Sequence, residues 1–135
     1  MVLREIRESK DRRGFTLMEM LVVVAIIVAL AGVGGYYYMQ AAESAKVSTA
    51  RTKAKTTLTD ACKTYWLDHN NQWPPSLDIL VTGDENGKAY LDDAGALKDP
   101  WEQVYQYDPA GTHNGGRKPD IFTRSPSGEE IGNWQ

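Results

Sequence analysis

A run of 20 residues without a charged side chain, from Met20 to Met39, constrains this 135-residue chain more than any other feature. At about 1.5 Å per residue, a helix of that length is roughly 30 Å long and matches the hydrocarbon core of a bilayer. Glu19 stands at the edge of the run, and an ionised carboxylate in lipid is costly unless it stays near the interface or finds a partner. The run therefore predicts a membrane-spanning helix with one carboxylate that needs a partner.

Charge is distributed unevenly on either side of this run. Residues 1–14 carry a net charge of +2, whereas the rest of the chain carries −5, for a total of −3. A basic leader before an apolar span predicts that the leader stays in the cytoplasm and that the C-terminal part is exported. The acidic remainder argues against nucleic acid as a partner, because phosphate groups are bound by basic surfaces.

The sequence contains no pattern that indicates an enzyme. The single cysteine, Cys62, cannot form an intramolecular disulfide, and we expect a small buried side chain on a helix, with a free nucleophile or an intermolecular disulfide as the alternatives. His69 and His113 lie in turn-like surroundings without the spacing of metal ligands. Nothing resembles a catalytic triad, a phosphate loop or a zinc motif, so we expect a protein without catalytic activity.

Apolar residues continue at helical spacing beyond the uncharged run. They recur every three or four residues, which places them on one stripe of a helix: Val47, Ala50, Ala54, Leu58, Ala61 and Tyr65. We therefore predict one helix from about Leu17 to Leu67, with its second half packed against the residues that follow. Asn70-Asn71 and Pro74-Pro75 are expected to end it, because asparagine tolerates left-handed backbone and proline cannot continue a helix.

The rest of the chain predicts short elements. Ser76 is expected to cap a short helix, and residues 82–87 are expected to form a solvated loop rather than an EF-hand. Residues 103–107 alternate polar and apolar side chains and predict a strand, as do residues 120–124. Together these elements predict an α+β fold, with a long N-terminal helix packed on a small antiparallel sheet.

The segment Arg13 to Glu19, Arg-Gly-Phe-Thr-Leu-Met-Glu before an apolar helix, resembles the type III signal of type IV pilins and type II secretion pseudopilins. The resemblance implies that a prepilin peptidase cuts between Gly14 and Phe15 and that the new terminal Phe15 is N-methylated. It also implies that Glu19 pairs with the terminal amine of a neighbouring subunit during assembly. An amine is the partner that a carboxylate in an apolar bundle needs.

Three later segments resemble the major pseudopilins of type II secretion: residues 65–74, residues 99–101 (Asp-Pro-Trp) and residues 120–134. The resemblance implies a type IV pilin-like fold. Its parts would be a cleaved leader (1–14), a transmembrane and assembly helix (15–39) and a periplasmic globular domain (40–135).

Two positions depart from the family pattern. Glu102 stands where the family has glycine, so we expect that turn to differ. Gly34-Gly35 stands near the family's helix-breaking proline. This glycine pair predicts either local melting in a filament or close packing of helices.

Calcium is the one cofactor that the resemblance suggests, because the family binds it in the loop before Ile131. The candidate ligands here are Asp120, Ser125 and Glu130 with backbone carbonyls, although calcium takes six or more oxygens and the loop is short. The alternative is a loop closed by the packing of Ile131 and Trp134.

The resemblance implies a structural subunit of a type II secretion pseudopilus, anchored in the bacterial inner membrane with its C-terminal domain in the periplasm. By resemblance, its partners would be copies of itself, the prepilin peptidase, minor pseudopilins and an inner-membrane assembly platform. Two alternatives stay open: a type IV pilin for adhesion or DNA uptake, and a single-pass membrane protein whose exported domain binds a partner without polymerising.

Overall fold

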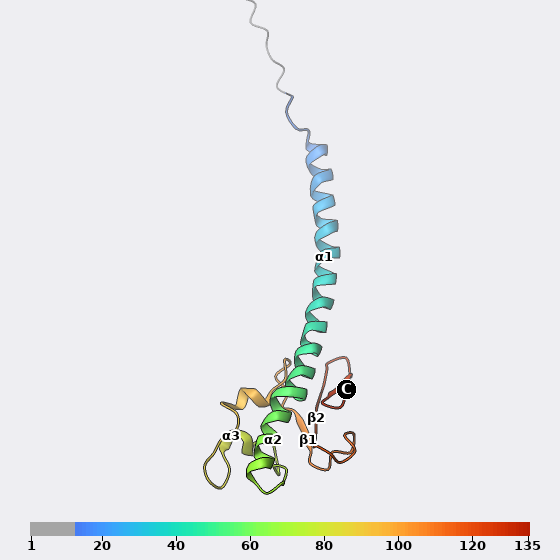
Figure 1. The fold of residues 1–135 in the computed structure, drawn as a ribbon. Helices are drawn as coiled ribbons and strands as arrows, with labels where there is room; N and C mark the ends of the chain where they lie inside the picture. Colours follow the sequence, from blue (N-terminus) through green and yellow to red (C-terminus); the bar gives the residue numbers. More distant parts are fainter. Residues whose placement is uncertain (1–12) are drawn as a thin grey trace, which may run out of the picture. The chain divides into compact units, whose positions relative to one another are not determined.

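The computed structural model describes residues 13–135, so most of the predicted leader lies outside the described residues. Three helical segments follow one another without a break: α1 (Leu17–Thr52), the π-helical turn η1 (Lys53–Leu58) and α2 (Thr59–Asp68) (Figure 1). This confirms the predicted helix from about Leu17 to Leu67. The fold as a whole is α+β and pilin-like, as predicted.

The chain divides into two compact units, residues 1–39 and residues 40–135. In the first unit, α1 is regular through Gly32, Gly34 and Gly35, and a Cβ atom added to any of these glycines would meet nothing within 4 Å. Whether this segment melts in an assembled filament stays a prediction. The second unit contains the remaining helix, all the strands and the core.

The stripe predicted for the second half of the helix is buried. Val47 is half-buried, and the other five members are buried: Ala50, Ala54, Leu58, Ala61 and Tyr65. The π turn lies in the middle of this stripe. The Thr59 hydroxyl donates to the Ala54 carbonyl, five residues back, at 2.7 Å. A buried threonine therefore finds its acceptor inside the widened turn.

The segments after the helix are short. Asn70 and Asn71 have φ angles of 50° and 64°, which confirms that left-handed asparagines end the helix. The next helix, α3, spans Ile79–Thr82 with Asp78 at its N-cap position and no capping side chain, so the prediction of Ser76 as the cap was wrong. A 3₁₀ turn, η2 (Ala94–Leu97), leads towards the sheet.

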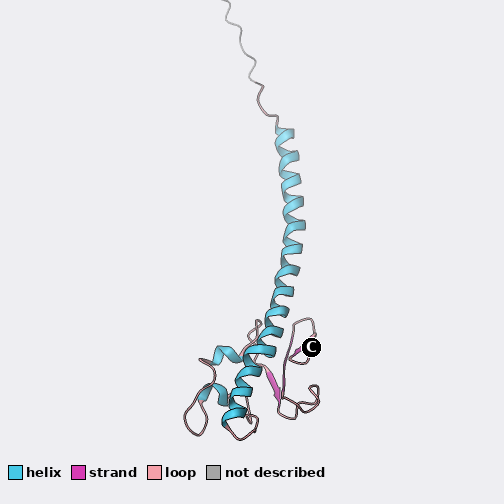
Figure 2. Ribbon diagram, viewed as in Figure 1, coloured by secondary structure: helices cyan, strands magenta, loops and turns pink. Residues whose placement is uncertain are grey.

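The sheet has three antiparallel strands in the order β1-β2-β3. Strands are a small part of the second unit beside its helices and loops (Figure 2). β2 spans Asp120–Arg124 as predicted. β1 is restricted to Gln106–Asp108, shorter and later than predicted, because Val104 pairs only with Lys98 in an isolated bridge. β3 (Glu130–Gly132) was not predicted.

The core of the second unit lies between the helix, α3 and the sheet. Its fully buried members include Leu58, Cys62, Leu80 and Ile121. Burial raises the pKa of the Cys62 thiol to about 12, so this cysteine behaves as a small apolar side chain, as expected. Tyr105 joins the sheet side to the helix, because its hydroxyl donates to the Ala50 carbonyl at 2.9 Å.

Candidate functional site

The described part of the first unit, residues 13–39, presents an apolar surface that no other residue of this part covers. Every residue from Leu17 to Met39 is exposed. Its large apolar side chains include Leu21, Ile27 and Leu30, with exposed fractions of 57%, 59% and 67%. Soluble monomers rarely expose an apolar surface this long, so it marks contact with a membrane or another protein. By length and composition, this helix is able to cross a membrane.

The chain before this helix is accessible. Residues 13–16 form no regular secondary structure, and Phe15 is 84% exposed. A Cβ atom added to Gly14 would meet nothing within 4 Å. The bond between Gly14 and Phe15 therefore lies in open chain just before the first turn, as a protease substrate requires. Cleavage and methylation there stay predictions.

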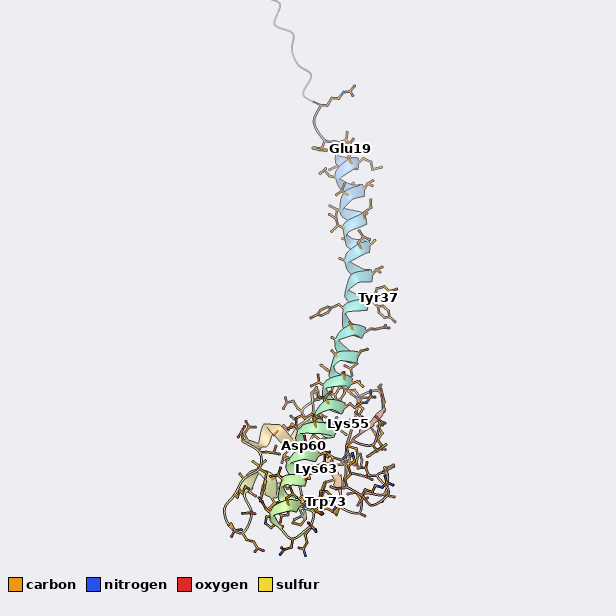
Figure 3. The ribbon with its side chains drawn as sticks, in the orientation of Figure 1. Glu19, Tyr37, Lys55, Asp60, Lys63 and Trp73 are labelled. Carbon is orange, nitrogen blue, oxygen red and sulfur yellow. The ribbon has the colours of Figure 1, made fainter. Side chains whose placement is uncertain are left out.

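Glu19 closes the first turn of the helix (Figure 3). Its carboxylate oxygen Oε2 accepts from the Thr16 backbone N–H at 3.0 Å, and the Thr16 hydroxyl accepts from the Glu19 N–H at 3.2 Å. The pair forms a capping box, which satisfies two backbone donors that the start of a helix leaves free. This role of Glu19 was not predicted, although its signal, Thr-x-x-Glu before an apolar run, is present in the sequence.

The capping box sets the position of the Glu19 charge. It turns the carboxylate back towards Thr16 and therefore towards the residue that would become the N-terminus, Phe15. Among the described residues, Oε2 makes the hydrogen bond to Thr16 and Oε1 makes none. Oε2 thus caps the first turn of the helix, while Oε1 is free to accept a hydrogen bond from a further donor.

Three exposed tyrosines lie farther along the same helix. Tyr36, Tyr37 and Tyr38 are 62–75% exposed, and the Tyr36 and Tyr37 rings meet edge-on with centroids 5.9 Å apart. Tyr37 is labelled in Figure 3. They follow about 20 apolar residues, which is where the aromatic belt of a spanning helix belongs.

Asp120, the first candidate calcium ligand, is occupied by donors from the protein. Its carboxylate accepts from the backbone N–H of His113 at 2.7 Å and from that of Asn114 at 3.1 Å. The His113 ring and the Asn114 side-chain amide add contacts at 2.9 Å and 2.6 Å. Burial raises the Asp120 pKa, but these hydrogen bonds outweigh it and hold the pKa below its usual value.

The other two candidate ligands belong to different networks. Ser125 bonds to the Ser127 hydroxyl at 2.8 Å and accepts from the Glu129 N–H at 3.1 Å. Glu130 pairs with Arg124 at 3.0 Å. The structure does not bring Asp120, Ser125 and Glu130 together, and residues 13–135 contain no cluster of three His, Cys, Asp or Glu side chains fit to hold a metal. These residues do not fit a calcium ion.

Asn133 closes the C-terminal segment instead. Its side chain is 1% exposed and fully bonded. The oxygen accepts from the Asn114 amide at 2.9 Å and the Ile121 N–H at 3.2 Å, and the amide donates to Thr59 and to the Pro119 carbonyl, both at 3.0 Å. One buried amide thus ties the last strand, the turn before β2 and the helix together.

A second buried polar network organises the Asp-Pro-Trp turn. The Asp99 carboxylate accepts from the backbone N–H groups of Trp101 at 2.9 Å and Gln103 at 2.8 Å, and also from the Thr123 hydroxyl. The Trp101 indole donates to Glu43 on α1 at 3.0 Å. The turn is therefore fixed to the sheet at one side and to the helix at the other.

Glu102 adopts a left-handed backbone conformation, which glycine takes more readily than other residues. Its φ angle is 64°, and its side chain is 83% exposed, with Lys98 3.6 Å away. An ordinary residue thus takes a left-handed conformation here, and whether the turn differs from the family's stays a prediction.

The loop of residues 82–87 is not solvated throughout, contrary to prediction. The Asp84 side chain is 2% exposed and lies 3.2 Å from Nε2 of His69. His69 stacks on Tyr65 with centroids 3.8 Å apart, and the Tyr90 hydroxyl lies 3.0 Å from both Asp84 and Asp68. The loop is thereby attached to the end of the helix.

Comparison with known proteins gives matches over nearly the whole chain. The family described as "Type II secretion system (T2SS), protein G" matches residues 37–134, and the "Prokaryotic N-terminal methylation motif" matches residues 9–34. Proteins named type II secretion system core protein G are similar: that of Pseudomonas aeruginosa is 33% identical, with 94% of this chain and 98% of the relative covered. The Aeromonas hydrophila protein is 33% identical (94% and 95%), and the Vibrio cholerae protein 31% (95% of each). No solved structure matches significantly.

Proposed function

The chain belongs to the type II secretion system protein G family, and on this premise we propose that it is the major structural subunit of a pseudopilus. The subunits polymerise through the apolar helix of residues 15–39. Growth of the fibre drives folded proteins through an outer-membrane channel. The family is one of structural pseudopilins, so the role needs no catalytic residue.

The observation that carries this proposal is the exposed apolar helix with its one carboxylate turned back to the first turn. Lateral packing of such helices buries their apolar surface, and the free oxygen of Glu19 accepts from the amine of a neighbouring Phe15. The ion pair offsets the cost of placing a charge among apolar helices. It also sets the axial register of one subunit against the next.

We extend the proposal to processing and location. The prepilin peptidase removes residues 1–14 and methylates Phe15, and the spanning helix holds the subunit in the inner membrane before assembly. The domain of residues 40–135 faces the periplasm, where minor pseudopilins and an assembly platform are the further partners. Matches to protein G over most of the chain favour this function over a type IV pilin or a non-polymerising anchor.

Two substitutions at Glu19 test the pairing role. Glu19→Gln keeps the capping hydrogen bond, since glutamine also serves in capping boxes, but removes the charge. Glu19→Ala removes both. If the charge registers the subunits, both variants insert in the membrane and neither assembles, as electron microscopy of fibres after co-expression with the secretion machinery would show. Wild-type fibre yield from Glu19→Gln would contradict the pairing role.

The processing proposal has its own measurement. Mass spectrometry of the membrane-extracted protein should give a mature chain that begins at methylated Phe15. A variant with Gly14→Val should retain residues 1–14, because the branched side chain beside the Gly14–Phe15 bond blocks the close approach of the peptidase. An intact leader on the wild-type chain would contradict the proposal.

A further inference from the structure

A groove of about 270 Å³ lies at the end of α2, within the globular unit of residues 40–135. It is lined by Lys63, Trp66, Leu67, Trp73 and Arg117, and the surface of the lining is almost entirely apolar. The Trp66 and Trp73 rings face each other with centroids 5.7 Å apart. Leu67 is 71% exposed, so the helix presents an apolar side chain to solvent at this position. A polar residue would fit there at no structural cost.

The charges at the rim of this groove are basic. Lys63 and Arg117 stand at its edge, and Figure 3 shows Lys63 near Trp73 at this end of the helix. Lys63 makes one exposed contact with Asp60 at 3.2 Å, and Arg117 makes no ion pair within residues 13–135. The globular unit as a whole carries 14 Asp or Glu against 10 Lys or Arg. A basic groove on an acidic domain is suited to an acidic, apolar partner.

The same unit carries a second exposed apolar side chain, and this one has an acidic neighbour. Of the large apolar side chains described in residues 40–135, only Leu67 and Val104 are prominently exposed, and Val104 is 57% exposed. Glu102, two residues before Val104, is 83% exposed and is held in a left-handed conformation. Residues in such conformations persist where the surrounding structure enforces them, and they concentrate at functional surfaces. Here the Asp99 network enforces it.

Val104 and the groove lie at different heights along the helix. Tyr105, next to Val104, is bonded to Ala50, whereas Leu67 comes 17 residues later on the same helix. At 1.5 Å per residue, that separation is roughly 25 Å. Two complementary surfaces separated along a unit make a head-to-tail contact, which does not close on itself and continues as a filament.

We propose that Val104 of one copy of this chain docks in the Trp66–Leu67–Trp73 groove of a second copy, with Glu102 facing Lys63 and Arg117. Val104 is the apolar anchor, and the ion pairs form a polar rim around it. The inference rests on the proposed polymerisation and adds a second contact, between globular units. Glu102 then serves assembly at a cost in backbone strain.

Site-specific cross-linking tests the contact in assembled fibres. Leu67→Cys and Val104→Cys are placed in one full-length chain, and a short bis-maleimide is applied to fibres made with the secretion machinery. The native Cys62 is fully buried and does not compete. We expect a ladder of dimers and higher multimers from the double variant and monomer from each single variant. The matched control combines Leu67→Cys with Glu129→Cys and should give monomer. Glu129 lies 3.7 Å from Arg51, so it is at a similar height along the helix to Val104 but on a different loop.

The outcomes separate this inference from the function on which it rests. Normal fibres without the ladder overturn the contact alone, as does a cross-link from Leu67→Cys to a different polypeptide. A wild-type chain that forms no fibres overturns the proposed polymerisation itself.

Charge reversal gives a second measurement. Lys63→Glu alone and Glu102→Lys alone should each lower the cross-linking yield about two- to five-fold, the usual effect of one rim ion pair. The double reversal restores the pair between positions 63 and 102 and should raise the yield above that of either single variant, while Arg117 keeps it below the wild-type yield. Failure of that rescue would overturn the assigned partners.

Discussion

Glu102 shows how a single residue works against the stability of its own turn. A non-glycine residue in the left-handed region costs about 1–2 kcal/mol, and this is partly offset because glycine loses more backbone freedom on folding. The exposed contact with Lys98 contributes little. We therefore expect Glu102→Gly to raise the free energy of unfolding by about 0.5 kcal/mol.

The measurement is thermal unfolding of the detergent-purified protein, followed by tryptophan fluorescence. All four tryptophans lie in residues 40–135, so the signal reports on the globular unit. Glu102→Ala is the matched control, because it removes the carboxylate while keeping a side chain at positive φ, and it should not stabilise. If Glu102→Gly melts below the wild type, strain at this position is not the dominant effect.

The buried roles of single polar residues such as Asn133 were not predicted from the sequence. The prediction placed the apolar side chains of the helix correctly, because burial of Leu58 and Ala61 follows from periodicity alone. The role of Asn133 depends on four groups from three distant segments, which no local pattern encodes. Asp84 was assigned to solvent for the same reason, since its buried position depends on His69 and Tyr90.

At the scale of elements, the helix was predictable and the sheet only partly so. Helical spacing over some 50 residues repeats its signal many times, whereas β1 and β3 have three residues each and owe their pairing to β2. The π turn was not foreseen, because it arises where Thr59 finds both the Ala54 carbonyl and Asn133. The left-handed asparagines, by contrast, follow from residue type alone.

The start of α1 is the element whose local energetics bear most on assembly. Thr16→Ala removes the hydroxyl that accepts from the Glu19 N–H, and loss of such a cap costs about 1 kcal/mol. Opening of the first turn should then be roughly five-fold more frequent, so amide exchange of Glu19 and Met20, whose N–H groups are bonded to Thr16, should quicken by about that factor.

Hydrogen–deuterium exchange of the protein in lipid nanodiscs measures this effect. Thr16→Ser is the matched control, because serine caps as well as threonine and should exchange at the wild-type rate. Equal acceleration in both variants would show that the methyl group of Thr16, not its hydroxyl, protects the turn.

At the scale of the whole globular unit, buried carboxylates predict acid sensitivity. The Asp84 pKa is lowered, first by the hydrogen bond from the Lys88 backbone N–H, and that of Asp120 is lowered by the bonds from His113 and Asn114 that outweigh its burial. A folded-state pKa below the unfolded value means stability that is present above about pH 4 and lost as the pH falls through the folded values. The melting temperature should therefore fall steeply below pH 4.

Asp120→Asn separates this contribution from general acid effects. The variant should be less stable than the wild type at pH 7, and its melting temperature should depend less steeply on pH below 4, because one of the titrating groups is gone. An unchanged acid dependence would place the sensitivity elsewhere in the unit.

We expect calcium not to stabilise the globular unit. If calcium held the C-terminal segment, a concentration 100 times the dissociation constant would add about 2.7 kcal/mol to the free energy of unfolding. For a unit of this size, that corresponds to a rise in melting temperature of roughly 10–20 °C. The groups that would ligate the ion are already bonded, so binding would first have to break those bonds. Asp120 is bonded to His113 and Asn114, and Glu130 is paired with Arg124.

We expect millimolar calcium and a chelator to give melting temperatures within about 2 °C of each other, with magnesium as the control for ionic strength. A selective rise with calcium that Asp120→Asn abolishes would show that the ion displaces the protein donors around this carboxylate.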